Sequence, residues 1–492
     1  MSGSPVYVSG KLIGAVSYSL SGSTSPIGGL TPASDMANVL AYSSAAAGAS
    51  APDRSSISIP AGLRGDIAAG TGVAISSNAT LSRLPVPIAV SGLSAAGRAA
   101  FQEHLARTGY PIVVTPGGRA TKPQGSPVFA TPVPGGNFGA MISYGDVTAG
   151  GIGTTTYVCN GVALAFGHPL QFMGKSAFGA NDAISLGIIA DPVFGSYKLA
   201  NVGALFGVVD QDRMAGIRTQ LGHMPSLIPV TSSLTDTETG RSRNGESDVT
   251  MQQFVPSVAA SHLYANLQTV LDEVTPGSSL LTWVVTGKRA NGNPWTLTRT
   301  DRYNSSGDIA YDSVNEFYGQ LSTIASFPNE SVTVSRVSLT GHVTSVQKID
   351  TIQTVLVSKN GGPYKQRQVL QVHVGDHLAF HAALERHDGT THTVSLSLVV
   401  PDTAGQPAIL TVSGGFTQSI GPGSDCQFDP SSCPNTFPEL LQSLANATRN
   451  DSLTAAVLVE NPATFEPVTA ASSSRIIKAV VQGSIQIVLN VQ

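Results

Sequence analysis

The fold is decided by the stretch Met1-Ser2-Gly3-Ser4-Pro5-Val6-Tyr7-Val8-Ser9-Gly10-Lys11-Leu12-Ile13-Gly14-Ala15-Val16-Ser17-Tyr18. A turn of small residues around Ser2 leads into two short apolar runs that are hinged at Ser9-Gly10. Apolar runs on both sides of such a pair predict a β-hairpin. We therefore expect a rigid hairpin directly behind a tight serine turn.

The composition predicts a mainly β protein. The chain has 492 residues, enough for two to four domains with separate cores. Only 12% of residues are charged and 6% are aromatic, while there are 52 glycines and 30 prolines, a balance that favours many short strands joined by turns. The net charge of -4 gives no basic surface for nucleic acid, so we expect no nucleic-acid partner.

The cysteines and the apolar runs allow one local disulfide and predict one buried thiol and no membrane span. Cys426 and Cys433 lie in a Pro- and Ser-rich loop where a local disulfide is feasible, and Cys159 lies in an apolar strand pattern that favours a buried, inert thiol. No run reaches the roughly 18 apolar residues of a membrane span, so we expect no integral span in this chain.

The N-terminal third contains weaker patterns. Ser34 or Thr31 is expected to cap a short helix through Met36, and residues 41–84 form a low-complexity connection without sustained periodicity. Residues 85–115 predict a small βαβ-like unit. Its helix is capped by Ser94, carries Phe101 and Leu105, ends at Gly109, and holds His104 as a solvated or packed side chain.

A second hairpin delivers a histidine. Asn160-Gly161 lies between two β-rich runs, a strong hairpin signal, and the strand Val162 to Phe166 ends in Gly167-His168-Pro169. His168 therefore projects from a turn and can reach a neighbouring loop. The similar turn around His223 follows a weaker, more polar strand, so we interpret His223 as structural.

The C-terminal half predicts β modules. A polar stretch at 235–248 marks the end of a first domain, residues 1–235. Regularly spaced strands and turns then predict a β-rich domain at 249–335 and a β-sandwich at 336–416. Residues 417–492 hold a helix with Phe437, Leu440 and Leu444 on one face, followed by strands that dock on the β core.

Ser2 and His168 are the candidate catalytic residues. Acyl transfer by a serine needs a hydroxyl nucleophile, an imidazole that takes its proton, and backbone amides aimed at the developing oxyanion. Five acidic residues could orient the histidine, and the sequence does not select among Asp35, Asp146, Asp182, Asp210 and Asp212. The pair Asp212-Arg213 is also consistent with a structural ion pair.

Two competing sites are less favoured. The histidines between His373 and His392 could bind a metal, but His377 and His381 share one strand face while Leu378 and Phe380 share the other, which indicates a half-buried strand. The glycines at 150–153 lack the lysine and helix of a phosphate cradle. We expect neither a metal nor a cofactor.

Together the serine turn and the histidine turn resemble the SpoIVB peptidase family of serine peptidases. The resemblance rests on Met1 to Val6 with Gly10 to Val16, on Ala165-Phe166-Gly167-His168-Pro169, on Gly153-Thr154-Thr155-Thr156, and on Gln211-Asp212-Arg213 with Gly216-Ile217, and it covers roughly residues 1–45 and 130–230. It implies a chymotrypsin-like β-barrel peptidase domain, with a small α/β insertion, followed by β-sandwich modules. It also implies that Ser2 is the nucleophile and His168 the base.

This chain departs from the family pattern in two respects. Ser2 precedes His168, whereas the histidine comes first in the sporulation protease, and the glycine that starts the family's serine turn is absent. That glycine's amide would be an oxyanion donor. We therefore expect that the recorded start is internal, that an export signal lies upstream, and that the chain as written has lost part of its catalytic machinery.

The resemblance leads to two functional hypotheses. The first is a secreted or cell-envelope serine endopeptidase that acts on a protein or peptide. The second is a non-catalytic, envelope-associated or secreted β-rich binding or scaffold protein that retains a peptidase fold.

Overall fold

The chain is mainly β and divides into two compact units. A computed structural model describes residues 1–20, 27–43, 56–106, 113–125, 127–190, 197–416, 434–460 and 467–492. Strands make up 51% of the chain and helices 17%, as the composition predicts. Unit 1 comprises Met1–Thr231, Gly245–Ala265 and Val334–Arg336, and unit 2 comprises Ser232–Asn244, Asn266–Thr333 and Val337–Gln492.

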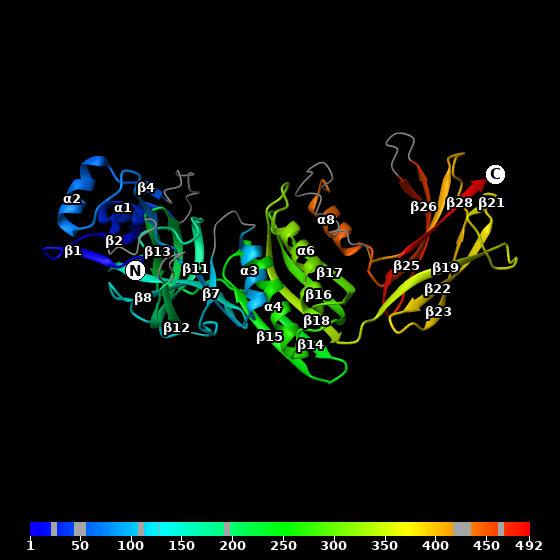
Figure 1. Cartoon of the computed structure of the whole chain (residues 1–492), viewed down its shortest axis with the longest axis horizontal. Helices are drawn as coiled ribbons and strands as arrows, with labels where there is room; N and C mark the ends of the chain where they lie inside the picture. Colours follow the sequence, from blue (N-terminus) through cyan, green and yellow to red (C-terminus); the bar gives the residue numbers. More distant parts are fainter. Residues whose placement is uncertain are drawn as a thin grey trace. The chain divides into compact units, whose positions relative to one another are not determined.

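Unit 1 begins with a five-stranded antiparallel sheet (Figure 1). Its order is β1-β2-β5-β4, and β3 also pairs with β2. The strands are β1 (Pro5–Val8), β2 (Lys11–Leu20), β3 (Gly28–Pro32), β4 (Ser56–Ser58) and β5 (Thr80–Arg83). The predicted N-terminal hairpin is confirmed, since Val8 pairs with Lys11 and the two turn residues, Ser9 and Gly10, have φ angles of 50° and 78°.

The larger sheet of unit 1 carries the histidine turn. Its pairings run β8–β11–β12–β13–β10–β9, and β9 also pairs with β8. The strands are β8 (Asn137–Gly145), β9 (Thr148–Cys159), β10 (Val162–Ala165), β11 (Gly174–Ile189), β12 (Tyr197–Arg213) and β13 (Gly216–Leu221). Buried Phe138, Phe166 and Phe206 pack together, with ring centroids 5.7 Å apart in each pair that shares Phe138. The predicted hairpin at Asn160-Gly161 is confirmed by the register of β9 and β10.

A βαβ unit flanks this sheet. The strands β6 (Ile88–Ser91) and β7 (Val114–Pro116) pair in parallel, with α3 (Ala95–Ala106) between them, as the sequence predicts. The Ser94 hydroxyl accepts a hydrogen bond from the Gly97 amide at 3.2 Å, so the predicted cap is confirmed. His104 on α3 is buried, and Gly109, the predicted helix end, lies outside the described residues.

Two expectations for the N-terminal third were wrong. The helix α1 (Ala33–Asn38) forms, followed by the short η1 (Val39–Ala41), but its N-cap is Pro32, and the Thr31 hydroxyl donates instead to the Gly167 carbonyl. The connection predicted at 41–84 contains β4, α2 (Ala61–Thr71) and β5. Helix α2 buries none of its residues, so it lacks the apolar periodicity by which a sequence reveals a helix.

The first part of unit 2 packs helices on a β-hairpin. The strands β16 (Gly277–Arg289) and β17 (Pro294–Ser305) pair along their whole length and lie beside α5 (Ile309–Asp312). The buried Trp283 indole donates to Gln320 of α6 (Asn315–Ala325) at 3.0 Å. The predicted helix α8 (Phe437–Ala445) is confirmed, with a Thr436–Glu439 capping box and Phe437 packed on Trp295. Helix α6 was not predicted from the sequence.

Five further elements lie between β13 and β19. They are β14 (Ile228–Asp236), β15 (Ser242–Val249), the short η2 (Gln252–Phe254), α4 (Val255–Leu271) and, after α6, β18 (Val332–Thr344). The polar stretch at 235–248 thus falls largely on β14 and β15. Helix α4, whose apolar residues are buried on several sides, was not predicted from the sequence.

The rest of unit 2 contains two five-stranded sheets that share one core (Figure 1). One has the order β20-β19-β22-β23, with β27 beside β19, and the other has the order β21-β28-β24-β25-β26. The strands are β19 (Ile349–Lys359), β20 (Lys365–Gln366), β21 (Val369–Val372), β22 (His377–Arg386), β23 (Thr391–Val399), β24 (Ala408–Gly414), β25 (Ser452–Glu460), β26 (Pro467–Ile476), β27 (Val480–Gln482) and β28 (Ser484–Val491). The C-terminal strands therefore belong to these sheets. Among the described residues, no helix is long and apolar enough to cross a membrane.

Candidate active site

The serine turn is fixed by hydrogen bonds to β2 and β9. The Gly3 amide donates to the Val16 carbonyl at 2.9 Å, and the Thr156 hydroxyl donates to the Gly3 carbonyl at 2.8 Å. Gly3 has a φ of +84°, and a Cβ there would collide with the Thr154 carbonyl and with the backbone of Phe166. A glycine is therefore required beside Ser2, both for its backbone conformation and for the close approach.

The histidine turn leaves β10 through two residues in the left-handed region. Phe166 has a φ of 70° and Gly167 a φ of 69°. Such a conformation is strained for a bulky residue and persists only where the surroundings enforce it. Here the Phe166 ring lies against Gly153 and meets Phe138 edge to face. This packing holds the turn and projects His168 toward the serine.

Ser2 and His168 meet, as the sequence predicts. The Ser2 Oγ lies 2.6 Å from the Nε2 of His168, and the His168 Nδ1 lies 2.8 Å from the Pro169 carbonyl oxygen. A carbonyl oxygen only accepts, so Nδ1 carries the proton and the neutral ring accepts from the serine through Nε2. The Phe166 carbonyl, 3.0 Å from the Ser2 Oγ, is a second acceptor for the same hydroxyl proton.

Burial keeps His168 neutral. The side chain is 1% exposed, and this burial lowers its pKa to about 4, with the charge of Arg83 acting in the same direction and the Pro169 carbonyl opposing it. A histidine with this pKa is unprotonated at neutral pH, which is the state that a general base requires. Ser2 is also buried, at 8% exposure.

Asp212 holds the loop that follows the histidine, and not the imidazole. Its carboxylate accepts backbone N–H groups of Leu170 and Gln171 at 2.8 Å and of Met173 at 3.2 Å, and it is fully buried. Burial raises its pKa, while these amides oppose the shift. Because Leu170 adjoins Pro169, Asp212 fixes the carbonyl that orients the ring. The sequence does not reveal this role of Asp212, because the carboxylate acts on the loop and the acceptor at Nδ1 is the backbone carbonyl of Pro169.

The other acidic candidates make different contacts. Asp210 forms a salt bridge with Arg218 at 2.7 Å, Asp146 one with Arg119 at 3.1 Å, and Asp182 accepts from the amide of Ala183. Asp35 is exposed on α1. Within the part of the chain that is described, none of these four has a contact with His168.

The remaining candidates lie away from the Ser2–His168 dyad. His223 is exposed, with its Nδ1 2.9 Å from the Leu221 carbonyl. On β22, His377 is exposed while Leu378 and Phe380 are buried, so the predicted alternation is confirmed. Cys159 is exposed, and the prediction of a buried thiol was wrong because the residue ends β9 at the hairpin. Cys426 and Cys433 lie outside the described residues.

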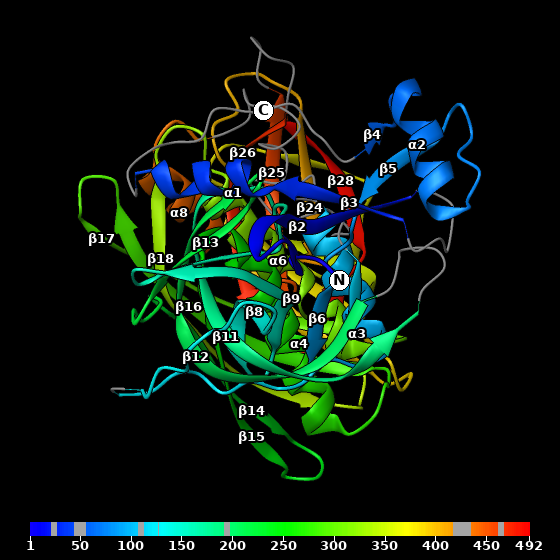
Figure 2. The ribbon, with the colours of Figure 1, turned by 90° about the vertical axis from the view of Figure 1, so that its left-hand side faces the viewer.

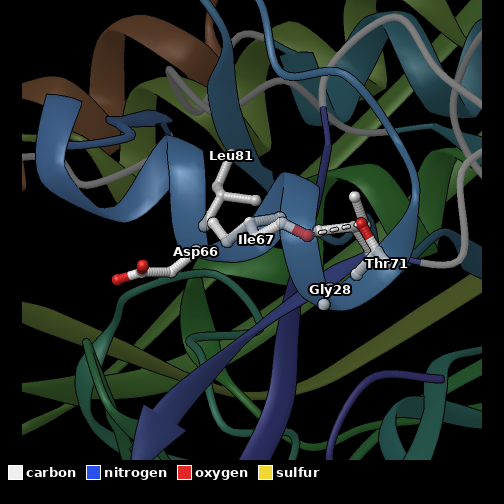
Figure 3. A pocket seen from close by; sticks show the side chains of 7 residues that line it. Gly28, Asp66, Ile67, Thr71 and Leu81 are labelled. Carbon is white, nitrogen blue, oxygen red and sulfur yellow. Dashed lines mark hydrogen bonds between the residues drawn. The ribbon is translucent and has the colours of Figure 1, made fainter.

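A cavity of about 400 Å³ lies beside α2 (Figure 3). Its lining includes Asp66, Ile67 and Thr71 of α2, Gly28 of β3 and Leu81 of β5. Neither Ser2 nor His168 lines it, so it is separate from the dyad. Among the described residues, no three His, Cys, Asp or Glu side chains are grouped to hold a metal ion.

No protein-family model, no curated protein and no solved structure matches the chain. The geometry of the site is therefore the basis on which a function can be proposed.

Gly3→Ala is expected to disable the site, because its methyl group would push the serine turn away from β9. A misplacement of the reacting group by about 1 Å typically lowers the reaction rate on the order of 10²-fold. The reaction rate of Ser2 with a fluorophosphonate measures the loss. Gly10→Ala is the matched control: its φ is +78°, so its backbone strain is similar, but a Cβ there meets nothing within 4 Å. Equal rates in both variants would contradict the proposed contact.

The pKa of His168 predicts how stability depends on pH. A histidine in the unfolded chain titrates near 6.5 and His168 in the folded chain near 4, so between these values the unfolded state binds more protons. The free energy of unfolding should therefore fall by up to about 3 kcal/mol on acidification from pH 6.5 to pH 4. Urea unfolding of the wild type and of His168→Gln isolates this contribution, which the variant should lack.

Proposed function

We propose that this protein is a serine endopeptidase, in which Ser2 is the nucleophile and His168 is the general base and then the general acid. The observation that supports it most is the 2.6 Å contact from the Ser2 Oγ to Nε2, together with the contact from Nδ1 to a carbonyl. A hydroxyl, a neutral imidazole and an acceptor behind the ring are the components of an acyl-transfer site.

The proposed reaction has two stages. The Ser2 Oγ attacks the scissile carbonyl while its proton passes to Nε2, and the Pro169 carbonyl stabilises the imidazolium through Nδ1–H. The imidazolium then gives the proton to the leaving amine, and a water molecule hydrolyses the acyl-enzyme with His168 again as base. In the described chain, the Ser2 amide has no acceptor, so it is free to donate to the oxyanion.

We further propose that this domain has the chymotrypsin-like barrel of the SpoIVB peptidases. The ring of pairings from β8 through β11, β12, β13, β10 and β9 back to β8 supports a barrel. The motifs that carry the resemblance also cluster in space. Ile217 pairs with Ala165 directly before the histidine turn, Asp212 holds the loop after it, and Thr154 lies against Gly3.

The second candidate is a non-catalytic binding or scaffold protein that retains the fold. The burial of the dyad favours it, since at 8% exposure Ser2 offers little surface to a peptide. The Phe166 carbonyl also competes for the hydroxyl proton.

Cleavage of an unfolded protein separates the two candidates. Reduced and alkylated casein, incubated with the chain, should yield fragments that mass spectrometry detects, and a fluorophosphonate should suppress them. Ser2→Ala should yield none, whereas Ser4→Ala, two residues away, should cleave as the wild type does. Fragments that persist in Ser2→Ala, or that never form with the wild type, would reject the peptidase in favour of the scaffold.

A further inference from the structure

One segment of β9, residues 153–156, supports the serine turn. The Thr156 hydroxyl donates to the Gly3 carbonyl at 2.8 Å. A Cβ on Gly3 would lie only 2.3 Å from the Thr154 carbonyl oxygen, so the two backbones are in close contact. The position of this segment therefore fixes Gly3, and with it the adjacent Ser2.

The same segment supports the histidine turn. The Thr154 carbonyl accepts from the Phe166 amide at 3.2 Å. The Phe166 ring lies so close to Gly153 that a Cβ on this glycine would meet two ring carbons at 2.3 Å. Because Phe166 comes two residues before His168, the segment also sets the position of the imidazole relative to the serine hydroxyl.

The Lys198 ammonium holds this segment from β12. It donates to the Gly153 carbonyl at 3.1 Å, to the Thr154 Oγ1 at 2.7 Å and to the Asn137 Oδ1 of β8 at 2.8 Å. In the described sheet β12 pairs with β11 and β13, so these hydrogen bonds join β12 to two strands with which its backbone does not pair. Figure 2 shows these strands from the side of the N-terminus. All three N–H groups of the ammonium are used to fix the segment and the strand beside it.

The charge of Lys198 costs free energy where it lies. Its three acceptors are neutral oxygens, and among the described residues no carboxylate forms an ion pair with the ammonium. The side chain is partly buried, and this burial lowers its pKa. A cation that leaves water without an opposite charge is usually unfavourable. The geometry that Lys198 imposes on the site explains its presence better than a gain in stability does.

We propose that Lys198 is a positioning residue of the peptidase site. Its ammonium fixes residues 153–156 and thereby keeps the Ser2 hydroxyl and the His168 imidazole at reacting distance. This inference rests on the proposed peptidase function. Within the described chain Lys198 has no hydrogen bond to Ser2 or His168, so its loss acts on the alignment of the dyad. Misalignment lowers kcat, whereas KM depends on contacts with the substrate that Lys198 does not make.

Lys198→Met tests the proposal, because it keeps a long side chain and removes the three donors. With reduced and alkylated casein as the substrate, kcat per folded molecule should fall at least about tenfold, and KM should change less than about twofold. Lys198→Arg keeps a cation with several donors and should retain at least about a third of the wild-type kcat. Lys175→Met is the matched control: this lysine lies on β11 and is exposed, so its loss should change neither constant. Urea unfolding gives the folded fraction of each variant.

A double-mutant cycle identifies the contact. Thr154→Val removes one acceptor and keeps a β-branched residue on β9, so it tests the same contact in a chain that retains Lys198. It should lower kcat at least about threefold, and the variant with both Lys198→Met and Thr154→Val should lose little more than Lys198→Met alone. If Lys198→Met does not fold, Thr154→Val decides alone, and a wild-type kcat in that variant would contradict the proposal.

Three further outcomes would overturn the proposal. They are a wild-type kcat in Lys198→Met, a loss in Lys198→Met that its unfolded fraction or its KM fully explains, and losses that multiply in the double variant. In each case, reaction of the wild-type Ser2 with a fluorophosphonate would leave the peptidase function in place. Absence of that reaction in the wild type would instead reject the peptidase function, and the role of Lys198 with it.

Discussion

Replacing His168 by alanine is expected to lower the hydrolysis rate by on the order of 10⁴- to 10⁶-fold, the largest effect in the molecule. The hydroxyl of a serine is a weak nucleophile without a base, and Nε2 lies 2.6 Å from Oγ. Ser2→Ala should cost as much, and the double variant little more, because the two residues act as one unit. Steady-state hydrolysis of an unfolded protein measures each loss.

His223→Ala is the matched control for His168. His223 also follows a glycine in a turn and also faces a carbonyl through Nδ1, but it is exposed. Its loss should change the rate by less than about twofold. A comparable fall in the hydrolysis rate of His223→Ala and His168→Ala would mean that the assay reports the stability of the fold and not the action of His168 as a base.

The second large effect is expected for Asp212→Ala. The substitution leaves three amides of the loop 170–173 without their acceptor in a buried site, and each unpaired amide costs about 1–3 kcal/mol. The loop should move, the Pro169 carbonyl should leave Nδ1, and the rate should fall on the order of 10²-fold or more. Urea unfolding and hydrolysis together measure the two consequences.

Asp212→Asn and Asp35→Ala give this prediction its controls. Asparagine keeps one acceptor oxygen, so Asp212→Asn should retain an intermediate stability and an intermediate rate. Asp35 is exposed, and Asp35→Ala should change neither the free energy of unfolding nor the hydrolysis rate. A wild-type rate in Asp212→Ala would show that the loop does not position the histidine.

The sequence predicted the two halves of the dyad because both depend on local turn chemistry. Gly3 beside Ser2 and Gly167 beside His168 have positive φ angles, and a glycine in the sequence predicts a turn at such a position. The apolar strand before His168 showed where the imidazole would emerge. These signals are short-range, so they can be read from a few neighbouring residues.

The support behind the dyad was not predictable in the same way. The acceptor at Nδ1 is the Pro169 carbonyl, and every residue has such an oxygen. Asp212 was one of five acidic candidates, and only the fold brings it to the loop after Pro169. Likewise α2 was missed because it buries no residue, and Cys159 was misplaced because its strand ends there.

Identification of the residue modified by a fluorophosphonate tests the central claim most directly. After labelling at neutral pH and proteolytic digestion, mass spectrometry should find a single adduct on Ser2, formed at a rate that His168→Ala reduces at least 10²-fold and that Ser4→Ala leaves unchanged. An unmodified Ser2, or an adduct that forms equally fast without His168, would contradict the account.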